Sequence, residues 1–222
     1  MATLIIVLWM VSITMLMLSD FSFLNPLLYV FVLIQMHLYT GLFITAHDAM
    51  HGTVAPNKPK LNLFFGQTCT LLYALFPFKA LYAKHHEHHD FVHSAKDPDY
   101  HEGKFIVWYY HFIKQYLSWR QVVLMAIIYN VLKIYLPEKN LLMFWVLPSL
   151  LSTLQLFYFG TYLPHKGEHQ NIYQSNTQSK NHVWAFFSCY FFGYHYEHHQ
   201  SPGTPWWKLW QVKEQNSSTN NG

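Results

Sequence analysis

The chain has 222 residues, of which 52% are hydrophobic, 19% aromatic and only 11% charged. Soluble domains carry about 25% charged residues, so the composition argues against an ordinary soluble domain and favours one membrane-embedded domain, 1–222. The net charge of +3 is too small and too dispersed to indicate nucleic-acid binding. Cys69 and Cys189 both lie in apolar runs, so we expect buried thiols rather than a disulfide framework or a zinc knuckle.

Four apolar runs are candidates for transmembrane helices, at 3–18, 26–46, 121–136 and 141–163. A membrane-spanning helix needs about 20 apolar residues, so the second and fourth runs are long enough. The first and third are short and need flanking residues or a thinner bilayer. The first run lacks the basic start and the small-residue cleavage site of a signal peptide, so we expect it to be retained.

The fifth apolar run, 61–78, is weaker because it contains Gly66, Gln67 and two threonines, and Pro77 disrupts its end. If this run crossed the membrane, the histidines that follow it would be separated from those that precede it. We therefore predict a re-entrant or interfacial segment. Two short aromatic-rich segments, 105–119 and 183–194, are predicted to be interfacial helices, and the polar tail 214–222 is predicted to be disordered.

Basic residues are distributed unevenly along this predicted topology. Of the 14 Lys and Arg residues, only Lys133 and Lys139 fall near the side away from the histidines, and the loop 19–25 contains none. Cytoplasmic loops of membrane proteins are enriched in Lys and Arg. The expected fold is therefore an all-α integral membrane protein with four transmembrane helices, a histidine-rich cytoplasmic cap, interfacial helices and both termini in the cytoplasm.

Three tight histidine clusters lie at the ends of apolar runs: His47 and His51; His85, His86, His88 and His89; and His195, His198 and His199. Residues three or four apart lie on one face of a helix, so His47 and His51, and in each longer cluster the first histidine and one of the last two, can bind a common metal ion. The neighbouring histidine of each longer cluster points in another direction and can reach a second ion. Imidazole is a strong ligand for iron, copper and zinc alike, so spacing alone leaves the metal open.

Other candidates surround these clusters. His165, in Tyr-Leu-Pro-His, follows the fourth apolar run and is a further candidate ligand, whereas the roles of His86, His169 and His37 stay open. Metal-bound imidazoles commonly donate their other N–H to a carboxylate. The acidic candidates for that role are Asp48, Glu87, Asp90, Asp97, Asp99 and Glu197, of which Asp48, Asp97, Asp99 and Glu197 are also the candidates for a role in catalysis. Asp97 and Asp99 flank Pro98, and a solvated turn is an equally good interpretation of that segment.

The number of histidines narrows the class of metal site. The membrane helices contain no Glu-x-x-His pairs, which disfavours a ferritin-like carboxylate di-iron bundle. A catalytic zinc site needs only three protein ligands and one open position. The clusters exceed that need and fit two ions.

The chain resembles the bacterial and cyanobacterial β-carotene ketolases, which form part of the membrane desaturase and hydroxylase superfamily. The matching segments are Leu-Tyr-Thr-Gly-Leu-Phe-Ile-Thr-Ala-His-Asp-Ala-Met-His-Gly (38–52), the cluster at 85–89 with Asp-Pro-Asp at 97–99, the stretch 144–165 that ends in Gly-Thr-Tyr-Leu-Pro-His, and Phe-Gly-Tyr-His-Tyr-Glu-His-His (192–199) with Pro-Trp-Trp at 205–207. Histidine boxes alone are common to the superfamily, while the strings at 47–52 and 162–165 are more specific to ketolases.

The resemblance implies a di-iron oxygenase that uses O2 and electrons, with a ferredoxin as the expected donor. Its substrate would be β-carotene or a related carotenoid, and the product a ketone at C4 of the β-ionone ring, first echinenone and then canthaxanthin. The iron ligands implied by the resemblance are His47, His51, His85, His88, His89, His165, His195, His198 and His199.

Three alternatives remain at this point. A carotenoid hydroxylase or a fatty-acyl desaturase would share the metal site and differ in its substrate tunnel. A non-enzymatic membrane carrier of metal or haem is the alternative of another class. Haem needs axial histidines deep in the bundle, and only His37 is so placed.

Overall fold

The computed structural model describes residues 1–179 and 181–219, and these residues form helices and loops with no strand. The helices are α1 (Ala2–Leu18), α2 (Pro26–Met50), α3 (Pro59–Ala74), α4 (Phe78–Phe91), α5 (Phe105–Tyr116), α6 (Trp119–Leu132), α7 (Glu138–Asn140), α8 (Leu147–Leu156), α9 (Leu163–His165), α10 (His182–Cys189), α11 (His195–Gln200) and α12 (Leu209–Thr219), with two π-helical stretches, η1 (Leu141–Val146) and η2 (Phe157–Tyr162), and a 3₁₀ turn, η3 (Trp206–Lys208).

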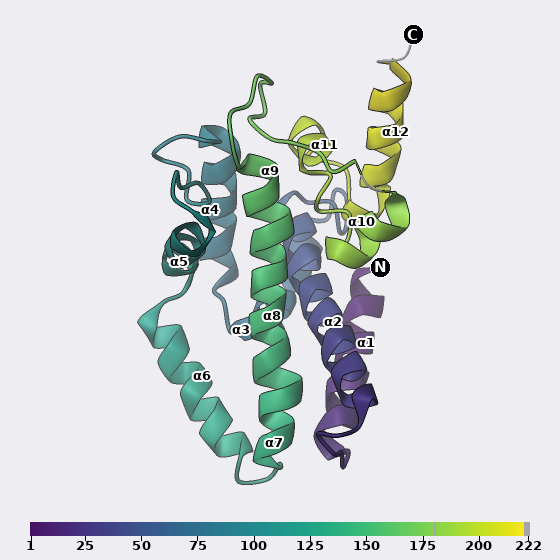
Figure 1. Ribbon diagram of the computed structural model, residues 1–222, viewed down its shortest axis with the longest axis vertical. Coiled ribbons are helices and arrows are strands. Elements are labelled where there is room, and N and C mark those ends of the chain that lie inside the picture. The colour runs from purple at the N-terminus through teal and green to yellow at the C-terminus, as the bar shows by residue number, and fades with distance from the viewer. Residues whose placement is uncertain (180, 220–222) are drawn as a thin grey trace.

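Helix α2 is the centre of the bundle and packs against α1, α3 and α8. Helices α4, α9 and α11 gather at one end of the molecule, whereas α7 and the loop between α1 and α2 lie at the opposite end (Figure 1). At that far end the Asn140 side-chain amide donates to Leu16 O at 2.9 Å and to Ser19 O at 2.7 Å. This buried amide ties the end of α1 to the start of the long helix that carries α8.

Among the described residues, two helical units are long and apolar enough to cross a membrane: α2, with 25 residues, and the continuous unit Glu138–His165, with 28 residues. They coincide with the second and fourth predicted spans. Helices also occupy the first and third predicted spans, but α1 has 17 residues and α6 only 14. The third predicted span, 121–136, is longer than the helix found there: α6 ends at Leu132, and Glu138–Asn140 already begins the next helix.

Large apolar side chains cover the outside of the bundle. Exposed examples on α1, α2 and α6 are Leu4, Val7, Met15, Leu27, Val30, Leu33, Val123, Ile127 and Val131. Soluble proteins rarely expose contiguous apolar surface of this extent. The apolar exterior and the two long helices together indicate a membrane protein.

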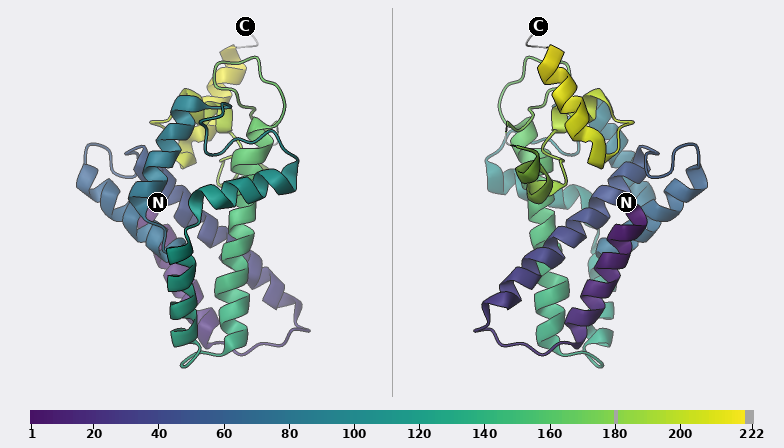
Figure 2. Two further views of the ribbon diagram at one scale, coloured as in Figure 1. Left: turned by 90° about the vertical axis from the view of Figure 1, so that its left-hand side faces the viewer. Right: turned by 90° about the vertical axis from the view of Figure 1, so that its right-hand side faces the viewer.

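The fifth run folds as two helices, α3 and α4, bent by 102° at the break between them. Helix α3 ends where Leu75 takes a left-handed conformation (φ 57°), and Pro77 precedes the first turn of α4. From the end of α2 the chain leaves along α3 and returns along α4 (Figure 2), so that His85 lies beside His51. A bend of this size is found in a broken span as well as in a re-entrant pair, so the re-entrant or interfacial segment stays a prediction.

Three predicted segments differ in length from the observed helices. The predicted interfacial helices 105–119 and 183–194 end earlier, at Tyr116 and Cys189, because the chain is extended at Leu117 and left-handed at Tyr190. The prediction of a disordered tail is wrong for 214–219, which belong to α12, while 220–222 lie outside the described residues. Long-range contacts order this helix: Glu214 lies 2.9 Å from His182 Nε2, and Asn216 donates to Gln200 at 2.7 Å. Both cysteines are buried free thiols, as predicted.

Candidate metal centre

The three histidine clusters and His165 converge at one end of the bundle, which confirms the expectation that they meet. Their elements are the last turn of α2, the second half of α4, the end of α9 and the short helix α11. The histidines sort into two groups, and within each group one ligand nitrogen per residue lies within 4.8 Å of all the others. The first group is His47, His51, His85, His89 and His198; the second is His88, His165, His195 and His199.

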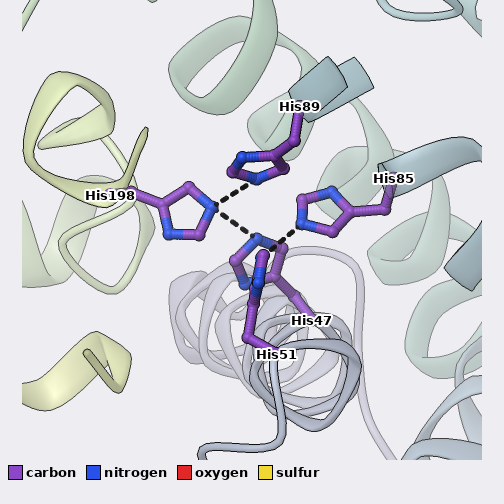
Figure 3. A group of neighbouring side chains, drawn as sticks. All are labelled: His47, His51, His85, His89 and His198. Atoms are coloured by element: carbon purple, nitrogen blue, oxygen red, sulfur yellow. Dashed lines mark hydrogen bonds between the residues drawn. The ribbon is translucent and has the colours of Figure 1, made fainter. Parts of the chain in front are cut away.

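In the first group the rings approach one another from α2, α4 and α11 (Figure 3). His198 Nε2 lies 3.1 Å from His47 Nε2 and 3.0 Å from His89 Nε2. His51 Nε2 lies 2.6 Å from His85 Nε2. His47 and His198 are buried, while His51, His85 and His89 are partly exposed. The five nitrogens therefore surround a common site. Buried rings close this site towards the bundle, and partly exposed rings leave it accessible from the surface.

The second group is buried throughout. His199 Nε2 lies 3.2 Å from His88 Nε2 and 3.0 Å from His195 Nε2. His165 Nε2 is buried and has no hydrogen-bond partner among the described residues, although its Nδ1 lies 2.9 Å from Gln174 O. An imidazole held through one nitrogen, with the other left unpaired in the interior, has the arrangement of a metal ligand whose second nitrogen is fixed by a backbone carbonyl.

Helix geometry explains why the box on α4 and the box on α11 each contribute to both groups. In α4, His85 and His89 are four residues apart and face the first group, whereas His88 faces the second. In α11 the relation is reversed: His195 and His199 face the second group, and His198 faces the first. The i, i+4 pair of each box shares one helix face and the remaining histidine projects from another, so two boxes interlock around two centres.

The distances fit two metal ions. Metal–imidazole bonds of about 2.1 Å that meet at roughly 90–100° place the two nitrogens about 3.0–3.2 Å apart, as observed for the pairs that involve His198 and His199. Burial, together with the neighbouring histidines, holds the pKa of His85, His195, His198 and His199 well below the usual value. Neutral imidazole is the form that binds metal. The ligand role of each histidine nevertheless stays a prediction.

Asp97 has the clearest supporting role among the acidic candidates. Its Oδ1 lies 2.8 Å from His88 Nδ1 and also accepts from Asp99 N, and its Oδ2 accepts from His93 N at 2.9 Å. Burial lowers the pKa of His88, but Asp99 and Asp97 outweigh burial and raise it above the usual value. Asp97 is thus placed to fix the ring of His88, and the interpretation of this segment as a solvated turn is wrong because Asp97 is buried.

The other acidic candidates take different positions. Asp48 Oδ2 accepts from Trp206 N at 3.1 Å, which joins the end of α2 to η3. Glu197 is buried, with Oε1 3.8 Å from Lys213 Nζ. Asp99 accepts a hydrogen bond from the Tyr116 hydroxyl, and burial raises its pKa to about 6. Glu87 and Asp90 are exposed on the outer face of α4.

The remaining histidines lie outside both groups. His86 stacks on Tyr82, with ring centroids 4.1 Å apart, and its Nδ1 is 2.9 Å from Tyr82 O. His37 stacks on Tyr190 within the bundle, and His169 lies against His93. His93 Nε2 is 3.0 Å from His165 O, a contact that sequence reasoning missed because no local pattern distinguishes His93.

A cavity of about 340 Å³ leads from the bundle to both groups. Its walls contain His47 and His85 of the first group and His88 and His195 of the second. The other lining side chains are mostly apolar or aromatic and include Phe43, Tyr73, Phe76, Tyr109, Phe112, Met125, Leu150, Leu156 and Phe192. A buried apolar cavity of about 150 Å³ is enough for benzene, so this one can receive a substituted ring at the metal centre.

The sequence of this chain is similar to those of known proteins. The model of the fatty acid desaturase family matches residues 24–139 and 104–219. A β-carotene ketolase from Haematococcus lacustris is 41% identical over 81% of this chain and 60% of its own length, and a β-carotene ketolase from a Paracoccus species is 40% identical over 78% of this chain and 73% of its own. A zeaxanthin 4-ketolase from Chlamydomonas reinhardtii is 41% identical over 78% of this chain and 41% of its own length.

The chain thus spans less than two thirds of the algal relatives and about three quarters of the Paracoccus relative. No solved structure matches it significantly. The matched regions contain all nine histidines of the two groups. By its sequence and by this arrangement of histidines, the chain belongs to the fatty acid desaturase family and, within it, to the β-carotene ketolases.

Proposed function

We propose that this protein is a di-iron β-carotene 4-ketolase that uses O2 and electrons to oxidise the C4 methylene of a β-ionone ring to a ketone. The observation that carries the proposal is the apolar cavity whose walls include histidines of both groups. The ketolase relatives support the choice of a carotenoid over a fatty acyl chain.

The nine histidines of the two groups would hold the two iron ions, five at one and four at the other. Iron bound there would supply the oxidising power, drawn from O2, that an unactivated C–H bond requires. The chain itself has three tasks: Asp97 orients His88, the aromatic walls exclude water, and the cavity positions the ring against the centre. A carotene has no polar group, so the shape of the cavity must select it.

The size of the cavity also bears on the order of products. At about 340 Å³ it suits one ring end rather than a whole carotene, so the polyene must remain in the apolar bundle or in lipid. Each end of the symmetric substrate would therefore enter in turn. We expect the mono-ketone echinenone to precede the diketone canthaxanthin.

Expression in a β-carotene-accumulating bacterium, followed by chromatography of the pigments, tests the proposed reaction. We expect echinenone early and canthaxanthin later. The amount of β-carotene should decrease as these ketones form. Accumulation of zeaxanthin, which has 3-hydroxyl groups and no ketone, would show instead that the protein is a hydroxylase.

We further propose that four helices cross the membrane, that α3 and α4 form a re-entrant pair, and that the histidine end and both termini face the cytoplasm. The distribution of Lys and Arg supports this orientation. A ferredoxin on the cytoplasmic side is the proposed electron donor. The partly exposed His51, His85 and His89 make the first group the nearer one to such a donor.

Single cysteines introduced between Ser94 and Gly103 test this orientation. That loop lies beside the second histidine group, because His93 contacts His165 O. We expect a membrane-impermeant thiol reagent to label these cysteines only after the cytoplasmic side is opened. Labelling in intact cells would contradict the proposed topology. The native thiols Cys69 and Cys189 are buried and should give a low background.

Substitution of Asp97 by asparagine tests the support of His88. Asparagine keeps the size of the side chain but removes the charge that the His88 Nδ1–H faces at 2.8 Å. Loss of such a carboxylate typically lowers metal affinity or activity about 10–100-fold, and we expect an effect of this size in both iron retention and ketone formation. Asp90→Asn, on the exposed face of α4, is the matched control. Equal behaviour of the two variants would refute the role of Asp97.

A further inference from the structure

A carboxylate and a phenol form a hydrogen-bonded pair on the wall of the cavity. Asp99 lies in the loop after α4, and Tyr116 is the last residue of α5; the Tyr116 hydroxyl donates to Asp99 Oδ1. Both residues line the cavity, together with His88 and His195 of the second histidine group. Asp99 Oδ2 accepts no hydrogen bond from the residues that the structure describes.

The backbone of Asp99 is fixed on both sides. Its N–H donates to Asp97 Oδ1 at 2.9 Å, and its carbonyl accepts from Trp108 Nε1 at 2.6 Å. The same Asp97 carboxylate faces His88. Asp99 is therefore held in a set position relative to the second histidine group, and its pair with Tyr116 has the rigidity that a binding group needs.

The other side-chain hydroxyls on this wall are mostly engaged within the bundle. Ser149 donates to Val146 O at 2.8 Å, and Thr153 donates to Ser149 O at 2.9 Å. Tyr73 is paired with Thr153 at 3.0 Å. Asp99 is the one carboxylate among the cavity-lining residues. A carboxylate oxygen in an apolar cavity is costly unless it has a partner; Tyr116 satisfies Oδ1 of Asp99, and a hydrocarbon substrate offers no partner for Oδ2.

The substrate gains a polar group only during the reaction. Two hydroxylations at C4, each using one O2, two electrons and two protons and releasing one water, give first an alcohol and then a geminal diol, which loses water to leave the ketone. The first hydroxyl forms at the metal-facing end of the cavity. The alcohol would be released into lipid unless the cavity held it for the second hydroxylation. On the basis of the proposed ketolase function, we propose that Asp99 and Tyr116 form the binding site for the C4 hydroxyl of this intermediate.

In this arrangement the hydroxyl of the intermediate donates to Asp99 Oδ2, while Tyr116 continues to occupy Oδ1. The hydrogen bond has two consequences. It retains the alcohol in the cavity, and it fixes the rotation of the ring, so that the remaining C4–H faces the metal centre. The pair thus favours the ketone over the alcohol as the released product, while leaving the binding of the unoxidised ring unchanged.

The test compares the wild-type protein and Tyr116→Phe, both iron-loaded in lipid nanodiscs, with β-carotene, O2 and an electron donor. The readout is the ratio of 4-hydroxy-β-carotene to ketone. Loss of a hydrogen bond that orients a charged acceptor corresponds to about a tenfold change in binding, and we expect this ratio to rise about tenfold. Tyr110→Phe is the control, since it removes a hydroxyl from the same helix but from an exposed side chain that does not line the cavity. Its product ratio should match that of the wild type.

A second measurement separates binding of the intermediate from a general loss of structure. With 4-hydroxy-β-carotene supplied as substrate, Tyr116→Phe should raise KM about tenfold, while KM for β-carotene stays within twofold of the wild type. A variant that loses activity on both substrates equally, with no released alcohol, would overturn the proposal. Asp99→Asn, which keeps the side-chain size, should shift the product ratio in the same direction and serves if Tyr116→Phe does not fold.

The same experiment distinguishes this inference from the proposed function. A wild-type protein that forms no ketone from β-carotene would refute both. A wild-type protein that forms ketone, with Tyr116→Phe and Asp99→Asn showing the wild-type product ratio and KM, would refute only the role of Asp99 and Tyr116.

Discussion

Replacing His198 with alanine is expected to reduce ketone formation to below about 1% of the wild-type rate and to remove one of two iron ions from the chain. His198 Nε2 lies between His47 Nε2 and His89 Nε2, at 3.1 and 3.0 Å, so it joins the contribution of α2 to that of α4 in the first group. Loss of residues that merely support ligands costs about 10–100-fold, and loss of a ligand itself should cost more. His89→Ala should behave in the same way.

Metal analysis and turnover of the purified protein are the measurements. The substitution removes a polar ring from a site that faces other histidines, so the helices should still insert and the protein should still be recovered from the membrane. His86→Ala is the matched control, because His86 belongs to the same helix as His89 but lies outside both groups. Full activity of His198→Ala, or about one iron ion per chain in the wild type, would refute the two-ion centre.

Substitution of Gly160 by alanine is expected to destabilise the protein by about 1–3 kcal/mol, the usual cost of overpacking a core, and to reduce activity at least tenfold. A Cβ at Gly160 would overlap with the ring of Phe192 at Cδ1, so that ring must move. That ring packs against His47 and His195, at centroid distances of 4.7 and 5.3 Å. The displacement should therefore disturb both histidine groups and narrow the cavity.

The thermal unfolding midpoint and the rate of ketone formation measure the two effects. Gly203→Ala is the control, because no atom lies within 4 Å of the position its Cβ would occupy. Adding Phe192→Leu to Gly160→Ala should recover part of the stability, since the smaller side chain makes room for the new methyl group. Gly160→Ala with wild-type stability and activity would show that Phe192 does not couple this position to the centre.

The sequence alone was sufficient for features that depend on local geometry. The spacings within the boxes predicted that their histidines converge, the position of His165 after the fourth apolar run added a further candidate, and the family resemblance implied the set of nine ligands. These nine histidines are the ones that the structure sorts into two groups. The apolar runs predicted the positions of α2 and of the long helix through His165, because length and hydropathy are local properties. Pro77 and the polar residues of 61–78 predicted a segment that does not continue straight, and α3 and α4 are bent by 102°.

Tertiary structure decided what depends on contacts between distant segments. Spacing could not tell that His88 joins His195 rather than His85, since that assignment depends on how α4 crosses α11. The sequence also left two interpretations of Asp97 open, a solvated turn and a support for His88. Only the folded loop places Asp97 Oδ1 2.8 Å from His88 Nδ1. The cavity, the pairing of Asp99 with Tyr116 and the order of the tail at 214–219 likewise arise from residues far apart in the chain. Local periodicity determines which face of a helix a side chain occupies, but only packing determines what that face meets.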